Sequence, residues 1–322
     1  MGKKILITGA AGMIGSHLIK HYCAEDQETS IIGLDISSRI AEKPLSNLWE
    51  PIVCDVLEKD RVADIVARSL PTIIYHLAAQ PSPTVSIVQP RETFRINCGG
   101  TINVFEAIKA VRLKRPDYDP VVIVACSSAQ YGASLLTLDK PATEETPFMP
   151  VHPYGASKVA QEMLALQYFR SDHIKTICAR IFNTTGPGKT GDAASDFLRS
   201  ALNIVNGKAS LLPVGNLDTC RAIIDVRDTV RALTLLSQKG TPGTAYNISG
   251  KTVYRMRRIL DLIEKVTEYT FTIKVNSELL RPVDEPLIVG DSSKLIEATG
   301  WEQLLGLEQT IRDMYAHLLE QN

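Results

Sequence analysis

A glycine-rich turn near the start of the chain joins a short apolar stretch to an amphipathic one. Residues 4–8 read Lys-Ile-Leu-Ile-Thr and predict a buried β-strand, and residues 13–25 have the apolar spacing of an α-helix. Gly9, Gly12 and Gly15 lie in and just after the turn. Such glycines allow a tight turn, close approach of the backbone to a pyrophosphate and close packing of the helix, whose N-terminus attracts phosphate. The turn therefore predicts a dinucleotide-binding Rossmann unit; a glycine turn without a ligand is the alternative.

An acidic residue ends the second predicted strand, where the fold would bring it to the same dinucleotide. Asp35 follows Gly15 by twenty residues and can accept hydrogen bonds from both hydroxyls of an adenine ribose. Its charge would repel a 2′-phosphate, so the sequence predicts NAD rather than NADP. Arg39 is the counter-argument, because a guanidinium there could bind that phosphate. Asp55 follows the third predicted strand, where it can meet the adenine edge or serve as an ordinary turn residue.

Length, charge and cysteine spacing exclude several classes of protein. With 322 residues the chain can bury a full hydrophobic core, and a net charge of −1 gives no reason to expect nucleic-acid or membrane binding. No apolar run reaches the roughly 18 residues of a membrane span, and the first strand begins too early to leave room for a signal peptide. The cysteines lack metal-ligand spacing, so we expect no metal site and a cytoplasmic protein. They stand at positions 23, 54, 98, 126, 178 and 220.

Predicted strands and helices alternate along the first part of the chain. The strands are expected over 4–8, 30–34, 51–54, 72–76, 120–126 and 175–180. The helices between them are expected over 13–25, 57–68, 91–112 and 154–171. This alternation predicts an α/β fold with a doubly wound parallel sheet, of the Rossmann type, covered by helices on both faces.

After Arg180 the alternation becomes irregular, which indicates a different kind of structure. Helices are predicted over 193–206, 227–238, 252–267, 292–299 and 307–320, with strands over 222–226 and 270–275. We expect a smaller α/β substrate-binding cap over the carboxyl ends of the parallel strands, where ligands bind in such sheets. The predicted division assigns 1–182 and the returning segment 222–250 to the Rossmann domain, and 183–221 and 251–322 to the cap.

A tyrosine and a lysine at the start of one predicted helix suggest proton transfer. Tyr154 and Lys158 are four residues apart, so both side chains lie on the same helix face. A nearby ammonium and a positive nicotinamide ring would lower the tyrosine pKa towards neutrality, which suits acid–base catalysis between an alcohol and a ketone. Ser127 ends the fifth strand and can hydrogen-bond the reacting oxygen, with Ser128 as the competing choice. Of the nearby histidines, His76 is interpreted as a packed strand-end residue, and His152 as a neighbour of the crevice.

Further motifs run through essentially the whole chain and carry a family resemblance. They are Gly9-x-x-Gly12-x-x-Gly15, Asp55, His76-Leu-Ala-Ala79, Asn97-x-x-Gly-Thr-x-Asn103, Ser127, Tyr154 with Lys158, and Arg180-x-x-Asn183. Together they resemble the extended short-chain dehydrogenase/reductases that act on nucleotide-sugars. Motifs of the C-terminal half resemble the branch that contains GDP-4-keto-6-deoxy-D-mannose reductase and GDP-mannose 4,6-dehydratase, and the reductase more closely. These motifs are Phe182-Asn183-Thr-Thr-Gly-Pro-Gly188, Val214-Gly-Asn-Leu-Asp218-x-x-Arg221, Asp225-Val-Arg-Asp228 and Arg281-Pro-x-x-x-Pro286.

The resemblance implies a set of binding residues and a partner. Catalysis is expected from Ser127, Tyr154 and Lys158. Cofactor binding is expected from Gly9, Gly12, Met13, Ile14, Gly15, Asp35, Asp55, Val56, Leu77, Ala78, Ala79, Asn97, Tyr154 and Lys158. Binding of a nucleotide-diphosphate sugar is expected from Ser82, Ser128, Asn183, Arg221, Arg281 and Glu285. A homodimer is also implied, in which helices 91–112 and 154–171 pair across a two-fold axis. The apolar residues offered for that interface are Val104, Ile108, Val111, Met163, Leu166 and Tyr168.

Two departures from the family pattern shape the functional prediction. Ala129 stands where the dehydratases carry a glutamate and GDP-fucose synthase a cysteine, and alanine transfers no proton. Asp35 is unusual for reductases of this branch, which commonly prefer NADPH, and is more typical of epimerases that hold NAD tightly. The sequence therefore favours reduction of the 4-keto group of a GDP-6-deoxyhexose, with an NAD-dependent nucleotide-sugar epimerase as the alternative. A 4,6-dehydratase and a non-catalytic cofactor sensor are further alternatives.

Overall fold

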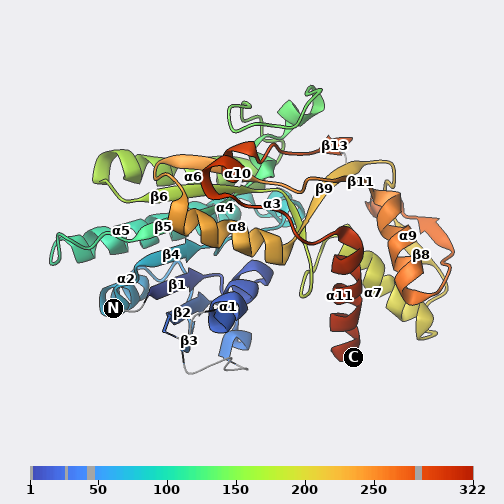
Figure 1. The fold of residues 1–322 in the computed structure, drawn as a ribbon, viewed down its shortest axis with the longest axis horizontal. Coiled ribbons are helices and arrows are strands. Elements are labelled where there is room, and N and C mark those ends of the chain that lie inside the picture. Colours follow the sequence, from blue (N-terminus) through green and yellow to red (C-terminus); the bar gives the residue numbers. More distant parts are fainter. Residues whose placement is uncertain (1–2, 26–27, 42–47, 280–284, 322) are drawn as a thin grey trace.

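A seven-stranded parallel sheet forms the centre of the computed structural model, which describes residues 3–25, 28–41, 48–279 and 285–321 (Figure 1). The strands lie in the order β3-β2-β1-β4-β5-β6-β10, and every neighbouring pair is parallel. Their bounds are β1 (Lys4–Thr8), β2 (Ser30–Asp35), β3 (Trp49–Val53), β4 (Ile73–His76), β5 (Val121–Ser127), β6 (Thr176–Ile181) and β10 (Thr244–Ile248). The strand order reverses between β1 and β4, which is where such sheets bind ligands.

Helices cover both faces of this sheet because its central strands are apolar on both sides. In β1, for example, Ile5, Leu6 and Ile7 are all buried, and they pack into two separate cores. The first face carries α1 (Met13–Glu25), α8 (Val226–Lys239) and α10 (Ser293–Thr299). The second carries α2 (Lys59–Ser69), α5 (Gly100–Arg112) and α6 (Pro153–Asp172). The predicted doubly wound Rossmann-type sheet is confirmed.

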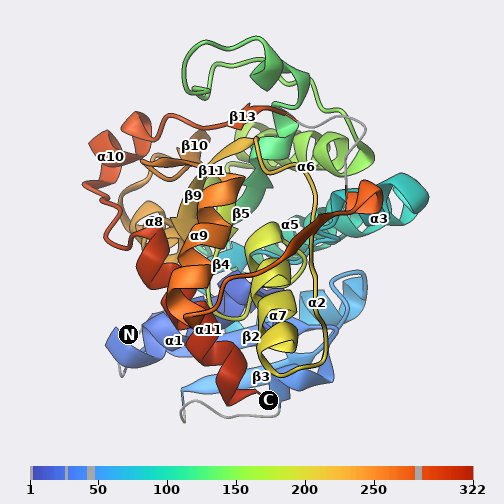
Figure 2. The ribbon, with the colours of Figure 1, turned by 90° about the vertical axis from the view of Figure 1, so that its right-hand side faces the viewer.

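The cap is built from two small sheets and three helices, which face the viewer in Figure 2. One sheet contains β7 (Asn183–Thr185), β9 (Cys220–Asp225), β11 (Val253–Arg255) and β13 (Leu287–Ile288), and the other pairs β8 (Leu212–Val214) with β12 (Ile273–Val275). Its helices are α7 (Ala193–Val205), α9 (Met256–Thr267) and α11 (Leu307–Glu320), whose apolar faces share one core. Within the segment 222–250, β9 pairs with cap strands whereas β10 extends the central sheet. The predicted division into domains remains a prediction.

Several local elements differ from the sequence prediction. The helix expected over 91–112 is α4 (Pro90–Phe94), a π-helical turn η2 (Arg95–Gly99) and then α5, preceded by a short helix α3 (Pro83–Val88). The edge strand β10 was not predicted, because its sequence Thr-Ala-Tyr-Asn-Ile mixes polar and apolar residues without the usual run of β-branched ones. The 3₁₀ turns are η1 (Ser38–Ala41), η3 (Ser128–Gln130), η4 (Ala133–Leu136) and η5 (Ser277–Leu279). None of the helices in the described ranges is long and apolar enough to cross a membrane.

The apolar residues proposed for a dimer interface require a correction. The side chains of Val104, Ile108, Val111, Leu166 and Tyr168 are buried within the chain itself, in the core between the sheet and α5 and α6. They therefore cannot supply an interface, since the apolar stripe of a sheet-covering helix faces the sheet first. Met163 is 43% exposed, and on the neighbouring α3 Ile87 is 63% and Val88 75% exposed. These exposed side chains remain available to a partner, and the homodimer itself stays a prediction.

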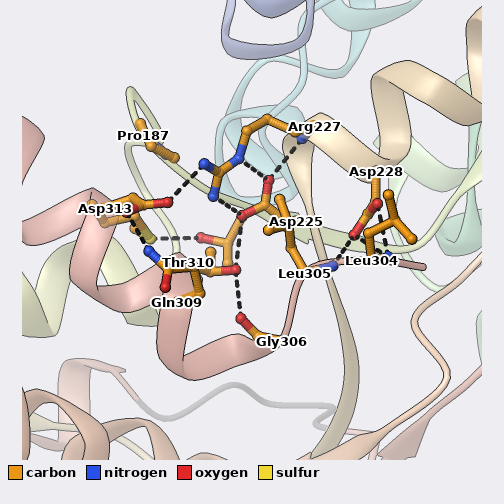
Figure 3. Close-up of polar contacts among 12 residues, drawn as sticks. Pro187, Asp225, Arg227, Asp228, Leu304, Leu305, Gly306, Gln309, Thr310 and Asp313 are labelled. Atoms are coloured by element: carbon orange, nitrogen blue, oxygen red, sulfur yellow. Dashed lines mark hydrogen bonds and ion pairs between the residues drawn. The ribbon is translucent and has the colours of Figure 1, made fainter.

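A buried aspartate fastens the C-terminal helix to the start of α8 (Figure 3). Asp225 accepts hydrogen bonds from the Arg227 guanidinium at 2.8 and 2.9 Å and from the Thr310 hydroxyl at 2.8 Å. Arg227 also pairs with Asp313 on α11 at 2.7 Å. Burial by itself would raise the pKa of the Asp225 carboxyl, but these donors outweigh it and hold the pKa below its ordinary value.

A second aspartate holds the loop that precedes α11. Asp228, which is fully buried, accepts hydrogen bonds from the backbone N–H groups of Leu304 and Leu305, the latter at 2.8 Å. Its own backbone carbonyl accepts from the Trp301 indole at 3.0 Å. The motif Asp225-Val-Arg-Asp228 thus fixes where the last segment of the cap docks.

Candidate active site

The glycine turn has the geometry that its spacing predicted. Gly9 adopts a φ of +72°, and its N–H donates to the Leu34 carbonyl at 2.8 Å. A Cβ added at Gly9 would lie 2.8 Å from the backbone nitrogen of Ala78, and one at Gly15 would collide with the Gly9 carbonyl oxygen. Positions 9 and 15 therefore require glycine, and the tight turn they allow brings the N-terminus of α1 to where a pyrophosphate would bind.

Two carboxylates lie at the same edge of the sheet and are held by backbone donors. Asp35, at the end of β2, accepts hydrogen bonds from the N–H groups of Ala11 and Ser37, both at 2.9 Å. This ties the carboxylate to the glycine turn itself. Asp55 accepts from the Leu57 N–H at 2.9 Å in the turn after β3. The side chain of Arg39, which could bind the 2′-phosphate of NADP, lies outside the described residues.

The other predicted cofactor residues begin α1, follow strands at this edge or lie in the π-helical turn. They are Met13, Ile14, Val56, Leu77, Ala78, Ala79 and Asn97. Asn97 links two of these segments, since its side-chain oxygen accepts from the Gln80 N–H at 2.7 Å and its amide donates to the Ser157 hydroxyl at 2.9 Å. The arrangement fits a nicotinamide dinucleotide, whose pyrophosphate would meet the glycine turn and whose adenine ribose would meet Asp35.

Ser127, Tyr154 and Lys158 come together where β5 and α6 meet. Ser127 is the last residue of β5, and its side chain lies near enough to the Tyr154 phenol to lower the pKa of that phenol. The Lys158 ammonium lies 5.9 Å from the centre of the Tyr154 ring and donates to the Ala125 carbonyl at 2.8 Å and the Gln161 side chain at 2.7 Å. The effect of Ser127 on the Tyr154 pKa supports Ser127 over Ser128, and the choice stays a prediction.

Burial governs the protonation equilibria of this set in the protein alone. Burial raises the pKa of the Tyr154 phenol above its ordinary value, and the Ser127 side chain only partly opposes that effect. Burial also lowers the pKa of Lys158 to about 8. In the protein alone, desolvation of the phenolate outweighs the effect of Ser127, and the lowering of the tyrosine pKa expected beside a positive nicotinamide ring stays a prediction. In the chain without cofactor the phenol is protonated, the form that a proton donor needs.

A cavity of about 730 Å³ separates these residues from the cap. On the sheet side it is lined by Ser127, Ser128, Ala129, His152 and Tyr154, together with Pro81 and Pro83. Of the residues predicted to bind substrate, Ser128, Asn183, Arg221 and Glu285 also line it. The Ser82 hydroxyl is instead used as the N-cap of α3, where it accepts from the Val85 N–H at 3.2 Å. Arg281 lies outside the described residues.

Asn183 and Arg221 show how the cap meets this cavity. The side-chain nitrogen of Asn183 is buried without a hydrogen-bond partner, which is costly unless a ligand accepts from it. The Arg221 guanidinium, also buried, donates to the carbonyls of Glu285 at 2.7 Å and Cys220 at 2.9 Å. Both features fit a polar, anionic ligand lying between the sheet edge and the cap.

The sequence analysis missed the polar residues that α7 and its preceding loop contribute to the cavity. They are Lys189, Asp192, Asp196, Arg199, Ser200 and Asn203. The signal was present, since residues 189–196 are a polar run directly before an amphipathic helix whose apolar face packs in the cap core. Without the tertiary structure, however, a polar helix face that lines a cavity looks the same as one that faces solvent.

The two histidines occupy contrasting positions. His76 is fully buried between the hydroxyls of Thr8 and Thr101, each 2.9 Å from a ring nitrogen, and burial lowers its pKa to about 3. The interpretation of His76 as a packed residue is confirmed. His152 caps α6 by accepting from the Gly155 N–H at 3.0 Å, and its ring stacks near that of Tyr154 in the cavity wall. His152 therefore lies beside the crevice, as expected.

Together, a Rossmann sheet with this glycine turn, a Ser–Tyr–Lys cluster and a cap over their common cavity define an extended short-chain dehydrogenase/reductase. More specifically, the chain belongs to the GDP-mannose 4,6 dehydratase family, whose pattern matches residues 6–314. This confirms the resemblance inferred from the sequence.

Individual relatives cover nearly the whole chain at modest identity. A GDP-6-deoxy-D-mannose reductase of Pseudomonas aeruginosa is 27% identical, over 97% of this chain and 96% of its own length. The solved structure of RMD from Pseudomonas aeruginosa complexed with NADPH superposes with a TM-score of 0.86 at 25% identity, covering 99% of this chain and 100% of that one. A UDP-glucuronic acid 4-epimerase of Bacillus cereus, in complex with UDP-glucuronic acid and NAD, gives 0.87 at 22% identity over 99% and 100% of the chains. The last likeness concerns the fold alone.

Proposed function

We propose that this protein binds a nicotinamide dinucleotide and a nucleotide-sugar, and reduces the 4-keto group of a GDP-6-deoxyhexose. The observation that carries the proposal is the cluster of Ser127, Tyr154 and Lys158, which opens into the cavity beside Ala129. A ketone reduction needs one proton donor and no second acid–base group next to the sugar. The methyl side chain of Ala129 supplies none, which argues against the water elimination of a dehydratase. The relationship to the Pseudomonas reductase supports the same choice.

The protein's own residues would perform the proton half of this reaction. The reduced nicotinamide, when bound, supplies the hydride that reaches the sugar C4. The Tyr154 hydroxyl donates its proton to the sugar O4, and Ser127 hydrogen-bonds that same oxygen and orients the phenol. Lys158 keeps a positive charge close to the phenolate that forms. The products are the C4 alcohol and the oxidised nicotinamide, so hydride and proton are both accounted for.

The cavity chemistry supports a diphosphate-linked substrate. Arg221 is buried in the wall that the cap contributes, and the buried amide nitrogen of Asn183 awaits an acceptor. A sugar diphosphate provides both the negative charge and the acceptor oxygens. For the cofactor we expect NAD, because the Asp35 carboxylate is held at the end of β2 by two backbone donors and cannot easily turn away from a 2′-phosphate.

An NAD-dependent nucleotide-sugar epimerase is the second candidate, and Asp35 is the observation that favours it. An epimerase oxidises and then reduces the same sugar carbon, so the same Tyr154 would serve as base and then acid. An epimerase differs from the proposed reductase because it consumes no reduced cofactor overall. Either activity uses the same cavity and cluster, so the substrate assay must separate them.

The deciding experiment offers UDP-, GDP-, CDP- and dTDP-sugars, and their 4-keto-6-deoxy forms, with NADH and NADPH in parallel. We expect stoichiometric oxidation of the reduced cofactor only with a GDP-4-keto-6-deoxyhexose. Epimer formation without cofactor consumption would instead establish the second candidate. Absence of turnover with every substrate would overturn both and leave a non-catalytic sensor.

The role of Tyr154 gives a direct test of the mechanism. Tyr154→Phe should reduce turnover by about 10²- to 10⁴-fold, the usual contribution of a general acid, while the affinity for cofactor changes little. Tyr269→Phe is the matched control, since Tyr269 is 45% exposed on the cap and should leave turnover unchanged. Near-normal turnover of Tyr154→Phe would remove the phenol from the mechanism.

A further inference from the structure

A continuous chain of buried, uncharged polar side chains runs from Lys158 to the glycine turn. It consists of Gln161, Thr101, His76 and Thr8, all fully buried, and is called here the buried polar chain. Lys158 donates to the Gln161 side-chain oxygen at 2.7 Å, and the Gln161 amide donates to the Thr101 hydroxyl at 2.9 Å. His76 joins the hydroxyls of Thr101 and Thr8, each at 2.9 Å. The buried polar chain thus connects α6, α5, β4 and β1.

Counting donors fixes the direction of every hydrogen bond in the buried polar chain. The single Thr101 hydroxyl proton is used at the Asn97 carbonyl, at 2.7 Å. Thr101 therefore only accepts from Gln161 and from His76, which places a proton on Nε2 of His76 and leaves Nδ1 to accept from Thr8. The Thr8 hydroxyl oxygen in turn accepts from the N–H of Ala78, at 3.2 Å, in the segment that packs against the glycine turn.

The direction of these hydrogen bonds also decides which atom of the Gln161 side-chain amide faces Lys158. Because Thr101 has no proton left to donate, the NH₂ group of Gln161 must face Thr101, and its oxygen must face Lys158. The ammonium is then held by two neutral acceptors, Gln161 and the Ala125 carbonyl, which use two of its three donors. The neighbouring carboxylate, Glu162, is committed to Arg180 at 2.6 Å.

We propose that Gln161 is a positioning residue for Lys158, and that the buried polar chain behind it sets the orientation of its amide and ties Lys158 to the glycine turn. The proposal rests on the assignment of Lys158 under the proposed function. Lys158 acts on cofactor and phenolate, whereas Gln161 acts only through Lys158. A neutral acceptor at position 161 keeps the ammonium in place without pairing it with a negative charge.

Replacing the neutral acceptor by a charged one should change the titration of Lys158. The titratable groups that face the ammonium are Tyr154 on α6, Cys126 on β5, Cys98 in the π-helical turn and His76 on β4. In the Gln161→Glu variant a carboxylate would accept from Lys158, and an opposite charge at that distance typically raises a lysine pKa by about 1 to 3 units. In Gln161→Leu the ammonium would lose an acceptor, so its pKa should fall below that of the wild type.

The experiment is an NMR titration of the full chain with ¹³C-labelled lysine side chains, without cofactor, using Lys158→Met to identify the resonance. We expect an upward shift of at least one pH unit in Gln161→Glu and a downward shift in Gln161→Leu. Gln167→Glu is the matched control: it lies on the same helix, its amide bonds Ser171 on the surface, and it should titrate like the wild type. Unchanged titration in either Gln161 variant, or an equal shift in Gln167→Glu, overturns the proposal.

A second readout links positioning to the cofactor. Because the charged form of Lys158 is expected to bind the cofactor, the affinity for NADH, measured by fluorescence, should fall as the pH rises through the pKa of Lys158. In Gln161→Glu the midpoint of this fall should move upward by the same amount as the lysine pKa. A purely structural defect would weaken binding at every pH without moving the midpoint, and that result also overturns the proposal. Neither measurement needs a sugar substrate, so failure of the proposed reductase activity would leave both results interpretable.

Discussion

His76 gives the most quantitative prediction, because its burial makes the folded chain sensitive to acid. The ordinary histidine pKa is 6.5, and in the folded chain it is lowered to about 3. The neutral ring is bonded on both sides, so protonation would break the bond from Thr8. Between pH 6.5 and about 3, His76 binds a proton in the unfolded chain but stays neutral in the folded chain. The stabilising effect is therefore complete above pH 6.5 and is lost as the pH falls towards 3.

The size of this effect follows from the two pKa values. Between pH 7 and pH 4.5 the unfolded state gains nearly one proton at this site, while the folded state gains almost none. The linkage relation gives a loss of about 2.5 kcal/mol in the free energy of unfolding, at about 1.36 kcal/mol per pH unit below the unfolded pKa. A loss of that size is a large fraction of the stability of an ordinary protein.

The test compares the wild type with His76→Gln in urea at the two pH values. Gln carries a donor and an acceptor but does not titrate, so the variant should be less stable overall and lose about 2.5 kcal/mol less on acidification. Fluorescence of the buried Trp49 and Trp301 reports unfolding. His173→Gln is the control, because that histidine is exposed and its replacement should leave the acid sensitivity unchanged. An equal acid-induced loss in wild type and His76→Gln would refute the reasoning.

Three further predictions address the cofactor, the glycine turn and the assembly. Asp35→Ser should shift the cofactor preference towards NADPH by about tenfold or more, because the repulsion between the carboxylate and the 2′-phosphate is relieved. Kinetics with NADH and NADPH measure this preference, and a wild type that already prefers NADPH would contradict the prediction. Gly15→Ala should abolish cofactor binding, measured by calorimetry, and lower the free energy of unfolding in urea by about 1–3 kcal/mol. Gly306→Ala is the control and should change neither quantity, because a Cβ there meets open space. Light scattering should report a homodimer that Met163→Asp converts to a monomer, and a wild-type monomer at micromolar concentration would argue against the interface.

The parts of this fold that the sequence predicts are those governed by local pattern. The glycine turn, the apolar strands and the Tyr154–Lys158 spacing each depend on residues close in sequence, and the structure places them as expected. The π-helical turn η2 was not predicted because nothing in the sequence Arg-Ile-Asn-Cys-Gly of residues 95–99 distinguishes a π-helical turn from an α-helical one. The N-cap role of Ser82 was also missed, although a serine before a proline-led helix fits it; the predicted contact of Ser82 with substrate stays a prediction.

Other features depend on contacts between distant segments, which no local pattern contains. The sign of the Tyr154 pKa shift follows from how deeply the phenol is buried, and that depth is set by packing of the whole chain. The buried polar chain joins residues from four elements, and in the sequence Gln161 looks like any other polar residue of a helix. Five of the six proposed dimer residues are buried in the chain itself for the same reason, since an apolar stripe shows that a helix face is covered but not what covers it.

The link between Asp225 and α11 also bears on how the protein is made. Leu307, Ile311 and Met314 of α11 complete the core of the cap, and Thr310 beside them bonds Asp225 at the start of α8. Every strand of the central sheet precedes these residues in the chain and so leaves the ribosome before them. The sheet can therefore assemble during synthesis while the cap stays unfinished. A stalled chain that ends before Gly306 should resist protease in the sheet and be cleaved in the cap; equal resistance in both would disprove this order. Nascent chains would then acquire the cofactor cradle before they acquire a closed chamber for the sugar.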